Sequence, residues 1–286
     1  MILVNSTDLT FWADRLEARS QLPRLIRRLI YATASDIEQS SFAADEGIQL
    51  SGWDGIVNAN VANMFVPANV SVWEMGVNKD PKSKADDDYQ KRSQNPLGLT
   101  PADTTFVFVT LRRWNGKETW IQARNAEGIW REVRAYDAED LAQWLEEASA
   151  VHLWLSVLLG KHPHSALSLD DFWIDWAGAT KPPLSPNLVI GGREPARDRI
   201  LTWFRGTPSV LTMQGDSPEE AVAFLSAVAQ TLSSEEKVVI LSRAVVVDDI
   251  AAWRGLILSS APLFLIARFD QPEIIGRAIQ KGHHVF

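Results

Sequence analysis

The order of helical and extended segments constrains the fold of this chain most. Before residue 31, apolar residues recur at the spacing of one helix face, so the chain opens with helix. Short β-like runs follow at residues 47–50, 53–57 and 70–75. A charged stretch, residues 79–95, predicts a loop leading into a solvated helix, and the clearest strand runs from Thr104 to Leu111. Helices and strands that alternate in this way predict an α/β fold.

The residues after Leu111 predict an antiparallel meander. Asn115-Gly116 supplies the positive-φ residues of a tight hairpin turn, which would lead into a strand at residues 119–122. A further strand is expected at residues 129–135, and Asp137 then caps a helix. The first part of the chain should therefore build a mixed sheet flanked by helices.

A proline-rich segment marks the expected division of the chain. The 286 residues are enough for two cores, since domains usually run about 100 to 200 residues. Three prolines within residues 182–186 oppose both helix and central strand. We therefore expect a first domain at residues 1–180, a linker at residues 181–186 and a smaller second domain at residues 187–286.

The second domain alternates strand-like and helix-like runs. Buried strands are expected at residues 187–190, 210–213, 237–241 and 262–267. An amphipathic helix at residues 218–231 and further helices separate them, which favours a parallel α/β sheet. The run before Phe286 looks like the start of another strand, so we expect this sequence to be a segment of a longer protein with further domains.

Composition limits the chemistry that the chain can perform. Cysteine is absent, which excludes disulfides, thiolate nucleophiles and cysteine zinc sites, and the five histidines are scattered. Any catalytic metal should therefore be held by carboxylates. The net charge of −8 argues against a protein that coats nucleic acid through bulk positive charge, and it leaves room for a local basic groove.

Hydrophobic patterning indicates a cytoplasmic protein. The sequence has no stretch of roughly 18 or more apolar residues and no basic segment followed by an apolar one at its start, so no membrane span is expected. The twelve tryptophans sit mostly at spacings that suit helices and strands. We expect them to pack in the core rather than to stack on nucleic-acid bases.

Two carboxylates lie where neighbouring strands can bring them together. Asp54 opens one predicted strand, and Glu74 lies inside the next. A nuclease that cuts a phosphodiester with a divalent metal needs at least two carboxylates on one ion, which contacts the phosphate and lowers the pKa of the attacking water. A purely structural interpretation also exists, in which Asp54 caps a turn and Glu74 faces solvent on an edge strand.

Three segments around these carboxylates resemble a known family. They are Gly52-Trp53-Asp54-Gly55, residues 66–74, and residues 84–92 from Lys84-Ala85 to Lys91-Arg92. They are similar to the PD-(D/E)XK, restriction-endonuclease-like domains fused to STAND-type NTPases in prokaryotic antiviral defence. The order helix, three strands, helix, strand is also the core order of that fold. The resemblance implies a Mg²⁺-dependent DNA endonuclease in which Mn²⁺ can substitute.

The resemblance assigns roles to individual residues. Asp54 and Glu74 would be metal ligands, and Glu38 would add a third oxygen ligand. The family pattern places a lysine two residues after the glutamate, where this chain has Gly76. Either the lysine has moved, with Lys84 as the first choice, or catalysis is weak or absent. The next choices for a relocated lysine are Lys79 and Lys82.

The charged helix offers contacts with a DNA backbone. Phosphate contacts supply most non-specific affinity for nucleic acid. The expected contacts are Lys79, Lys82, Lys91 and Arg92. Residues 86–88 are three aspartates that dilute this charge, so an ordinary solvated helix face is the alternative.

The second domain resembles a nucleotide-binding domain without its phosphate loop. Gly191-Gly192-Arg193-Glu194 is similar to the segment before the nucleotide-binding strand of STAND and related AAA-like ATPases. In place of the Walker A pattern, residues 214–220 read QGDSPEE, and two glutamates at a helix start repel phosphate. Asp216 or Ser217 can instead cap that helix. We expect a degenerate P-loop-like domain that transmits or scaffolds.

Three functions follow from these observations. The first is a metal-dependent DNA endonuclease effector of a prokaryotic anti-phage defence protein. The second is an inactive nuclease-like module that recognises nucleic acid or a partner protein. The third is a pair of sensor or assembly domains that act within a longer chain. For the first function, the resemblance implies activation by clustering, and therefore a homo-oligomer.

Overall fold

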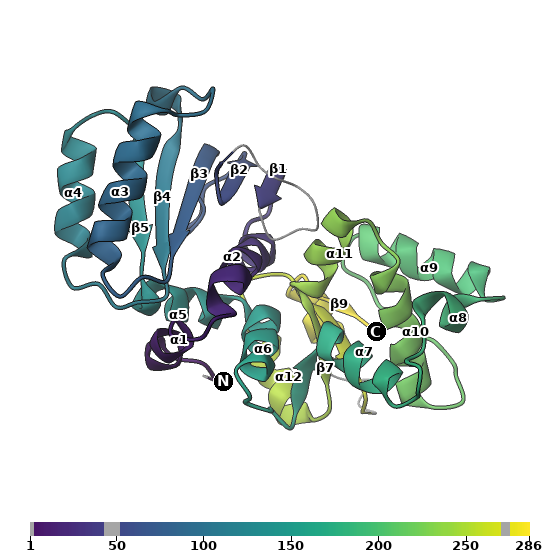
Figure 1. Cartoon of the computed structure of the whole chain (residues 1–286). Helices are drawn as coiled ribbons and strands as arrows, with labels where there is room; N and C mark the ends of the chain where they lie inside the picture. The colour runs from purple at the N-terminus through teal and green to yellow at the C-terminus, as the bar shows by residue number, and fades with distance from the viewer. Residues whose placement is uncertain (1–2, 43–51, 270–274) are drawn as a thin grey trace. The chain divides into compact units, whose positions relative to one another are not determined.

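The computed structural model describes residues 3–42, 52–269 and 275–286, and it divides into two compact units, Ile2–Glu146 and Glu147–Phe286 (Figure 1). The strand expected at residues 47–50 lies outside the described residues. The expected linker at residues 181–186 is wrong, because these residues belong to the second unit. Leu184 packs against its hydrophobic core and donates its N–H to the Ala177 carbonyl at 3.0 Å. The prolines therefore shape a turn within a domain.

The first unit is built on a five-stranded mixed sheet in the order β1-β2-β3-β4-β5. The strands are β1 (Ile37–Phe42), β2 (Gly55–Ala59), β3 (Asn69–Gly76), β4 (Thr105–Thr110) and β5 (Glu132–Tyr136). Strands β1, β2 and β3 pair antiparallel, whereas β3, β4 and β5 pair parallel. The helices of this unit are α1 (Ser6–Trp12), α2 (Ala18–Thr33), α3 (Pro81–Gln94), α4 (Lys117–Ala126) and α5 (Ala138–Glu147), with a 3-10 turn at Pro101–Asp103.

Parallel pairing replaces the expected meander. The hairpin predicted at Asn115-Gly116 is wrong, since helix α4 begins at Lys117 and carries the chain over to β5. A parallel pair needs such a crossover, whereas only an antiparallel pair can be joined by a two-residue turn. The order helix, three strands, helix, strand is present from α2 to β4. The α/β class with a mixed sheet is thus confirmed.

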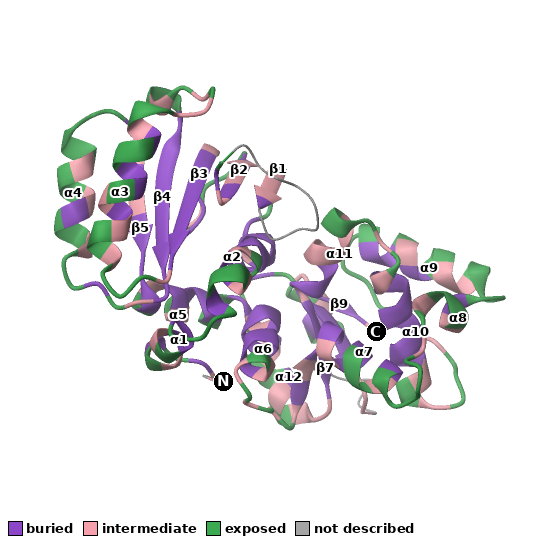
Figure 2. Ribbon diagram, in the orientation of Figure 1, coloured by how far each residue is buried: buried purple, intermediate pink, exposed green. Residues whose placement is uncertain are grey.

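Aromatic side chains fill both faces of this sheet. Helices α3 and α4 cover one face of the sheet (Figure 1). Tyr89 and Trp120 of these helices pack in one cluster with Phe106 and Phe108 of β4. On the other face Trp144 of α5 stacks on Phe65, with ring centroids 4.8 Å apart. Figure 2 shows β3 and β4 buried along most of their length. Eleven of the twelve tryptophans are buried and Trp176 is half-buried, so core packing is confirmed for them.

The second unit holds a four-stranded sheet in the order β6-β7-β8-β9. Its strands are β6 (Ala166–Ser168), β7 (Ala244–Val247), β8 (Phe264–Ala267) and β9 (His284–Val285). Its helices are α6 (Ser149–Leu158), α7 (Leu169–Gly178), α8 (Pro186–Ile190), α9 (Glu194–Arg205), α10 (Pro218–Gln230), α11 (Ser234–Leu241), α12 (Ile250–Leu256) and α13 (Ile275–Gln280). Because β6 pairs antiparallel with β7, the sheet is mixed, and the expected all-parallel sheet is wrong.

Two strands expected in this unit are helices. Residues 187–190 lie in α8 and residues 237–241 lie in α11. Ser185 and Ser233 cap these helices by accepting hydrogen bonds from the N–H groups of Leu188 and Glu236. Serine at the N-cap is a strong helix start, and it outweighs the strand preference of a short apolar run. No described helix is long and apolar enough to span a bilayer.

Candidate active site

Asp54 and Glu74 come together at one end of β2 and β3. The antiparallel register pairs Gly55 with Trp73. Asp54, which precedes Gly55, and Glu74, which follows Trp73, therefore lie at the same end of the two strands. The backbone N–H of Met75 donates to Asp54 Oδ2 at 2.7 Å. This bond ties the first carboxylate to the strand that carries the second. The spacing that the sequence indicated therefore brings both carboxylates to one end of the sheet.

Glu74 is buried, and an arginine of α3 pairs with it. Its side chain is 5% exposed, and its Oε1 accepts a hydrogen bond from Arg92 Nε, whose side chain is 6% exposed. The Arg92 guanidinium lies over the ring of Trp53, 4.6 Å from the centroid. Burial, reinforced by the negative charge of Asp54, raises the pKa of the Glu74 carboxyl to about 8, although Arg92 opposes the shift.

Helix α3 presents three charged residues to this end of the sheet. Lys84, Asp88 and Arg92 follow one another at four-residue intervals, which places them on one helix face. Lys84 Nζ donates to both carboxylate oxygens of Asp88, at 2.5 and 2.6 Å. Burial raises the pKa of Asp88, and the neighbouring Lys84 opposes that shift. Asp88 and Arg92 are buried, so the expectation of a solvated helix holds only for the outer face of α3, where Lys82 and Lys91 are exposed.

Lys84 occupies the space next to Gly76. A Cβ atom built on Gly76 would lie 2.8 Å from Lys84 Cγ and 3.6 Å from Lys84 Cε. The aliphatic stem of the lysine thus fills the volume that a side chain at position 76 would need. Of the two other lysines considered, Lys82 pairs with Asp86 at 2.7 Å and is exposed, and Lys79 is also exposed. Lys84 is the lysine that this geometry favours.

Gly52 and Trp53 lie against the guanidinium of Arg92. Gly52 has a φ of +88°, a backbone region that strongly favours glycine. A Cβ there would lie 3.1 Å from both Arg92 Nη1 and Leu97 Cδ1. The segment from Gly52 to Asp54 therefore has a local explanation in which glycine admits the guanidinium, tryptophan supports it and aspartate bonds to β3.

Glu38 lies away from this cluster. It is exposed on β1, where its Oε2 accepts a hydrogen bond from Asn58 Nδ2 at 2.6 Å. Asn58 stands four residues beyond Asp54, a distance of roughly 13 Å along a strand. The prediction that Glu38 is a third metal ligand is therefore wrong, because β1 places Glu38 near the other end of β2.

The predicted DNA contacts separate into two groups. Lys79 and Lys91 are exposed and Lys82 is exposed with Asp86 as its partner, so these lysines remain at the surface. Arg92 is buried against Glu74 and Trp53, and its assignment as a surface phosphate contact is wrong. Sequence reasoning missed Asp88 and Arg92 as members of the cluster. The repeat of charges at positions 84, 88 and 92 was the signal that could have identified them.

The donor set fits a divalent cation. The cluster of Asp54, Glu74, Asp88, Lys84 and Arg92 carries one net negative charge when all five are ionised, a state that the raised pKa of Glu74 places above about pH 8 in the absence of a cation. Among described residues, Asp54 Oδ1 and Glu74 Oε2 accept no hydrogen bond, while the second oxygen of each carboxylate is tethered. The described residues contain no group of three or more histidine, aspartate or glutamate side chains that could hold a metal ion, so the protein would supply only two ligands here. Mg²⁺ commonly takes one or two carboxylates with waters and substrate phosphates, and the Asp54–Glu74 pair suits that mode.

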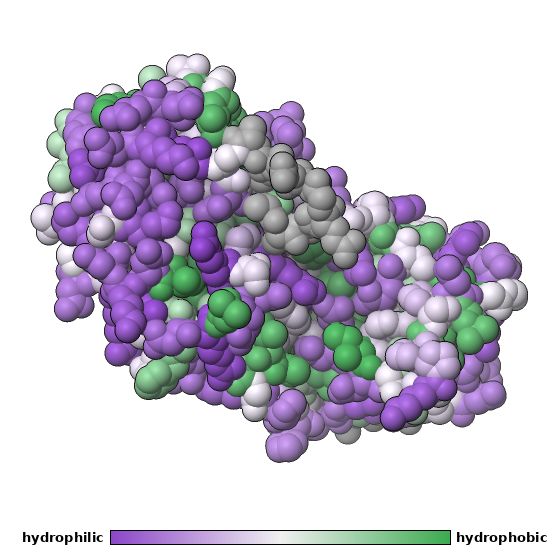
Figure 3. All heavy atoms as spheres, in the orientation of Figure 1, coloured by the Kyte–Doolittle hydropathy of each residue, from purple (hydrophilic) through white to green (hydrophobic). Residues whose placement is uncertain are grey.

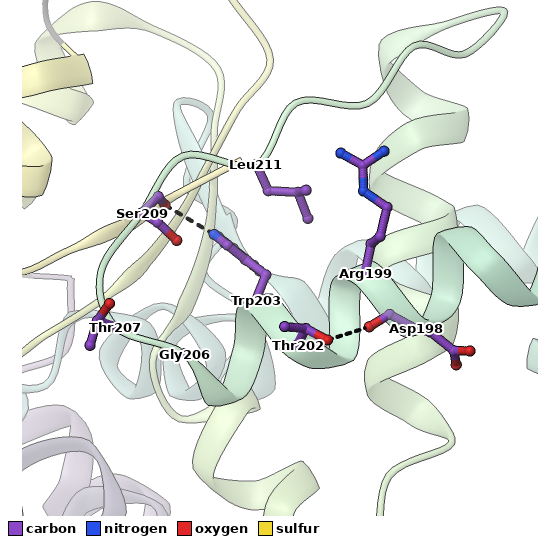
Figure 4. A pocket seen from close by; sticks show the side chains of 8 residues that line it. All are labelled: Asp198, Arg199, Thr202, Trp203, Gly206, Thr207, Ser209 and Leu211. Atoms are coloured by element: carbon purple, nitrogen blue, oxygen red, sulfur yellow. Dashed lines mark hydrogen bonds between the residues drawn. The ribbon is translucent and has the colours of Figure 1, made fainter.

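The second unit has no comparable cluster among its described residues. A groove of about 490 Å³ runs along α9. The indole of Trp203 donates to the Ser209 carbonyl there, at 3.0 Å (Figure 4). Arg199 is the one basic residue of the eight that line it. At the start of α10, Ser217 caps the helix by accepting from the Glu220 N–H at 3.1 Å, as expected, and Arg193 pairs with Glu220. This loop therefore has a structural explanation.

Comparisons with protein-family models, with curated proteins and with solved structures find no match to this chain. The geometry of the cluster at the ends of β2 and β3 therefore carries the functional assignment.

Proposed function

We propose that Ile2–Glu146 is a nuclease domain of the PD-(D/E)XK type that hydrolyses DNA with Mg²⁺, or with Mn²⁺ in its place. Asp54 and Glu74 hold the cation, and Lys84 supplies the positive charge that the family motif places two residues after the glutamate. The observation that carries this proposal is the contact of Lys84 with Gly76 beside the paired carboxylates. Lys84, which comes from helix α3, occupies the space that a lysine at position 76 of strand β3 would occupy.

The residues of this chain have distinct tasks in that reaction. A bound divalent cation would contact the scissile phosphate and lower the pKa of the attacking water. Asp54, tethered to Met75, and Glu74, tethered to Arg92, are held in place before substrate arrives. Asp88 holds the Lys84 ammonium through both carboxylate oxygens, and the lysine charge would stabilise the negative charge that grows on the phosphate in the transition state. Hydrolysis then leaves 5′-phosphate and 3′-hydroxyl ends, as the resemblance implies.

The biological setting proposed here comes from the resemblance. The domain acts as the effector of a prokaryotic anti-phage defence protein, in the cytoplasm, and is activated when copies of the chain cluster as a homo-oligomer. Residues 147–286 serve as a degenerate P-loop-like domain that transmits or scaffolds. The capped start of α10, with Glu219 and Glu220 in its first turn, supports a role without nucleotide chemistry.

One observation favours a second candidate, an inactive nuclease-like binding module. The Arg92 guanidinium already neutralises Glu74, and burial keeps the pKa of that carboxyl high. A site that had lost its metal would be stabilised by the same pairing. In this second function the domain recognises nucleic acid or a partner protein without cutting.

Cleavage assays with matched lysine variants test the proposal. The 286-residue chain is incubated with supercoiled plasmid and linear duplex DNA in Mg²⁺ or Mn²⁺. Asp54→Asn, Glu74→Gln and Lys84→Met should each slow cleavage by about 100-fold or more. Lys82→Met, assayed at saturating DNA so that a lost phosphate contact does not enter the rate, is the control, because Lys82 lies on the same helix and also pairs with an aspartate four residues later.

Each outcome selects among the functions. Cutting that survives both carboxylate substitutions rejects the site. If wild-type protein never cuts, even when fused to an oligomerising domain, the inactive module replaces the nuclease. If Lys82→Met is as slow as Lys84→Met, the assignment of the lysine is wrong while the nuclease stands.

A further inference from the structure

We propose that Arg92 is a positioning residue that fixes the Glu74 carboxylate by one oxygen and leaves the other oxygen for the divalent cation. This inference rests on the nuclease function proposed above and assigns a role to a residue that is neither a proposed metal ligand nor the proposed lysine. Arg92 touches neither the proposed cation nor the scissile phosphate in this role; it acts through Glu74.

The arginine is held from three sides. Its Nε donates to Glu74 Oε1, its guanidinium lies 4.6 Å over the Trp53 ring, and Gly52 leaves room for its terminal nitrogens. Both charged side chains of the pair are 5 to 6% exposed. A buried ion pair that also stacks on an aromatic ring has few alternative arrangements, so the carboxylate that it holds has few as well.

The contact requires arginine rather than positive charge alone. A planar guanidinium can stack on an indole and donate in its own plane at the same time. An ammonium at the end of a lysine is a compact, strongly hydrated charge without a planar face, so it cannot stack on the indole while it donates to the carboxylate. Lysine at position 92 would therefore neutralise Glu74 without fixing its orientation.

Helix α3 links this function to the position of the relocated lysine. Arg92 follows Lys84 by eight residues, or about 12 Å along a helix, and Asp88 lies between them on the same face. Asp88 restrains Lys84, and Arg92 restrains Glu74. One rigid helix thus positions both the metal ligand on β3 and the lysine beside Gly76.

A competing role for Arg92 predicts the opposite change in metal affinity when the arginine is removed. If the guanidinium merely occupied the place of the cation, its removal would leave a more negative cluster and tighter metal binding. A positioning role predicts weaker binding, because an unrestrained carboxylate must be ordered when the cation binds. Loss of an outer contact to a metal ligand typically weakens affinity by about 10 to 100-fold.

The test measures binding of Mn²⁺ to the full chain, by electron paramagnetic resonance of the unbound ion, with no dependence on cleavage. Arg92→Lys should bind Mn²⁺ about 10 to 100-fold more weakly than wild type. Arg124→Lys is the matched control, since Arg124 also pairs with a carboxylate, Asp86 at 2.7 Å, and stacks on a ring, Tyr89 at 4.9 Å. The Tm of Arg124→Lys should fall by no more than that of Arg92→Lys. Its affinity for Mn²⁺ should stay within about twofold of that of wild type.

Every outcome decides something. Binding by Arg92→Lys that equals or exceeds that of wild type overturns the positioning role and leaves the metal site standing. If wild type itself binds no Mn²⁺, the proposed function fails and the role of Arg92 fails with it. If Arg92→Lys does not fold, Trp53→Phe keeps the ion pair and removes part of the supporting ring, and unchanged Mn²⁺ affinity in that variant rejects the proposal.

Discussion

Lys84 lies across Gly76, with its Cγ only 2.8 Å from the point where a Cβ of residue 76 would stand. Lys84 lies on helix α3 and Gly76 at the end of strand β3. The space between them holds the side chain of Lys84 and has no room for a second side chain on residue 76. Figure 3 shows a mostly hydrophilic surface over α3 and α4. The contact with Gly76 therefore lies on the inner side of α3, whose outer side faces water.

Moving the lysine back to the strand tests this relationship. Lys84→Ala should slow DNA cleavage by about 100-fold or more, because one stabilising charge is lost. The double variant Lys84→Ala, Gly76→Lys should recover a substantial part of the rate, because removing the Lys84 stem opens the space that a lysine at position 76 needs. Single-turnover cleavage rates provide the measurement.

The controls for the lysine swap isolate the contact itself. Gly76→Ala in an otherwise wild-type chain should push Lys84 aside and slow cleavage, whereas Gly255→Ala, with nothing within 4 Å of its added Cβ, should not. A double variant as slow as Lys84→Ala would argue against a common place for the two lysines.

Mg²⁺ should stabilise the first unit through its carboxylates. A cation at 100 times its dissociation constant adds about 2.7 kcal/mol to the free energy of unfolding when it binds only the native state. Differential scanning fluorimetry should therefore show a rise in Tm with Mg²⁺ that EDTA reverses. Asp54→Asn should abolish the rise, and Glu38→Gln should preserve it, because Glu38 bonds to Asn58 instead. A rise that depends on Glu38 would restore the expected third ligand.

His283 should make the second unit less stable in acid. Its Nδ1 accepts from the Leu263 N–H at 3.1 Å, and its Nε2 lies 3.2 Å from the Ile257 carbonyl, so the neutral ring satisfies both partners. Burial, assisted by the charge of Lys281, lowers the pKa of His283 below 6.5. The unfolded chain therefore binds the proton more readily than the folded chain, and this contribution to stability is present above about pH 6.5 and is lost as the pH falls through the folded pKa.

Protection of one backbone amide measures that loss directly. Amide exchange at Leu263 should accelerate, relative to intrinsic rates, between pH 7 and pH 5, because a protonated imidazole cannot accept its N–H. His283→Gln should flatten the pH dependence, and His164→Gln, in an exposed loop, should leave it unchanged. Equal protection of Leu263 at both pH values would contradict this account.

The loop before α10 should behave as a helix cap and not as a phosphate site. Ser217→Ala should cost about 1 kcal/mol of stability, which is typical for loss of an N-cap hydrogen bond. ATP with Mg²⁺ should shift the Tm of wild type and of a Glu219→Gln, Glu220→Gln variant by no more than Mg²⁺ alone. An additional shift in wild type, lost in a variant with Gly215 replaced, would reveal a nucleotide site that the acidic first turn argues against.

The sequence carries enough local information for much of the fold. Strand β4 is apolar and rich in β-branched and aromatic residues, and α10 has a cap, a proline at its start and an apolar face, so each segment specifies its own structure. The pairing of Asp54 with Glu74 is also nearly local, because consecutive antiparallel strands bring such residues together whenever the connecting loop closes. Short apolar runs such as residues 237–241 fit either state, and their serine caps were the deciding signal.

What the sequence by itself determined, then, is the α/β class, the positions of β2, β3 and β4 and the presence of two carboxylates on adjacent strands, whereas it predicted neither β1 nor α4. The tertiary structure decided which face of α3 turns inward, and with it that Lys84 replaces a side chain at Gly76 and that Arg92 pairs with Glu74. The physical reason is that a helix face made of charged residues is expected, from its sequence, to face solvent. Its burial becomes favourable only when the sheet supplies carboxylates, a glycine gap and the Trp53 ring to receive it.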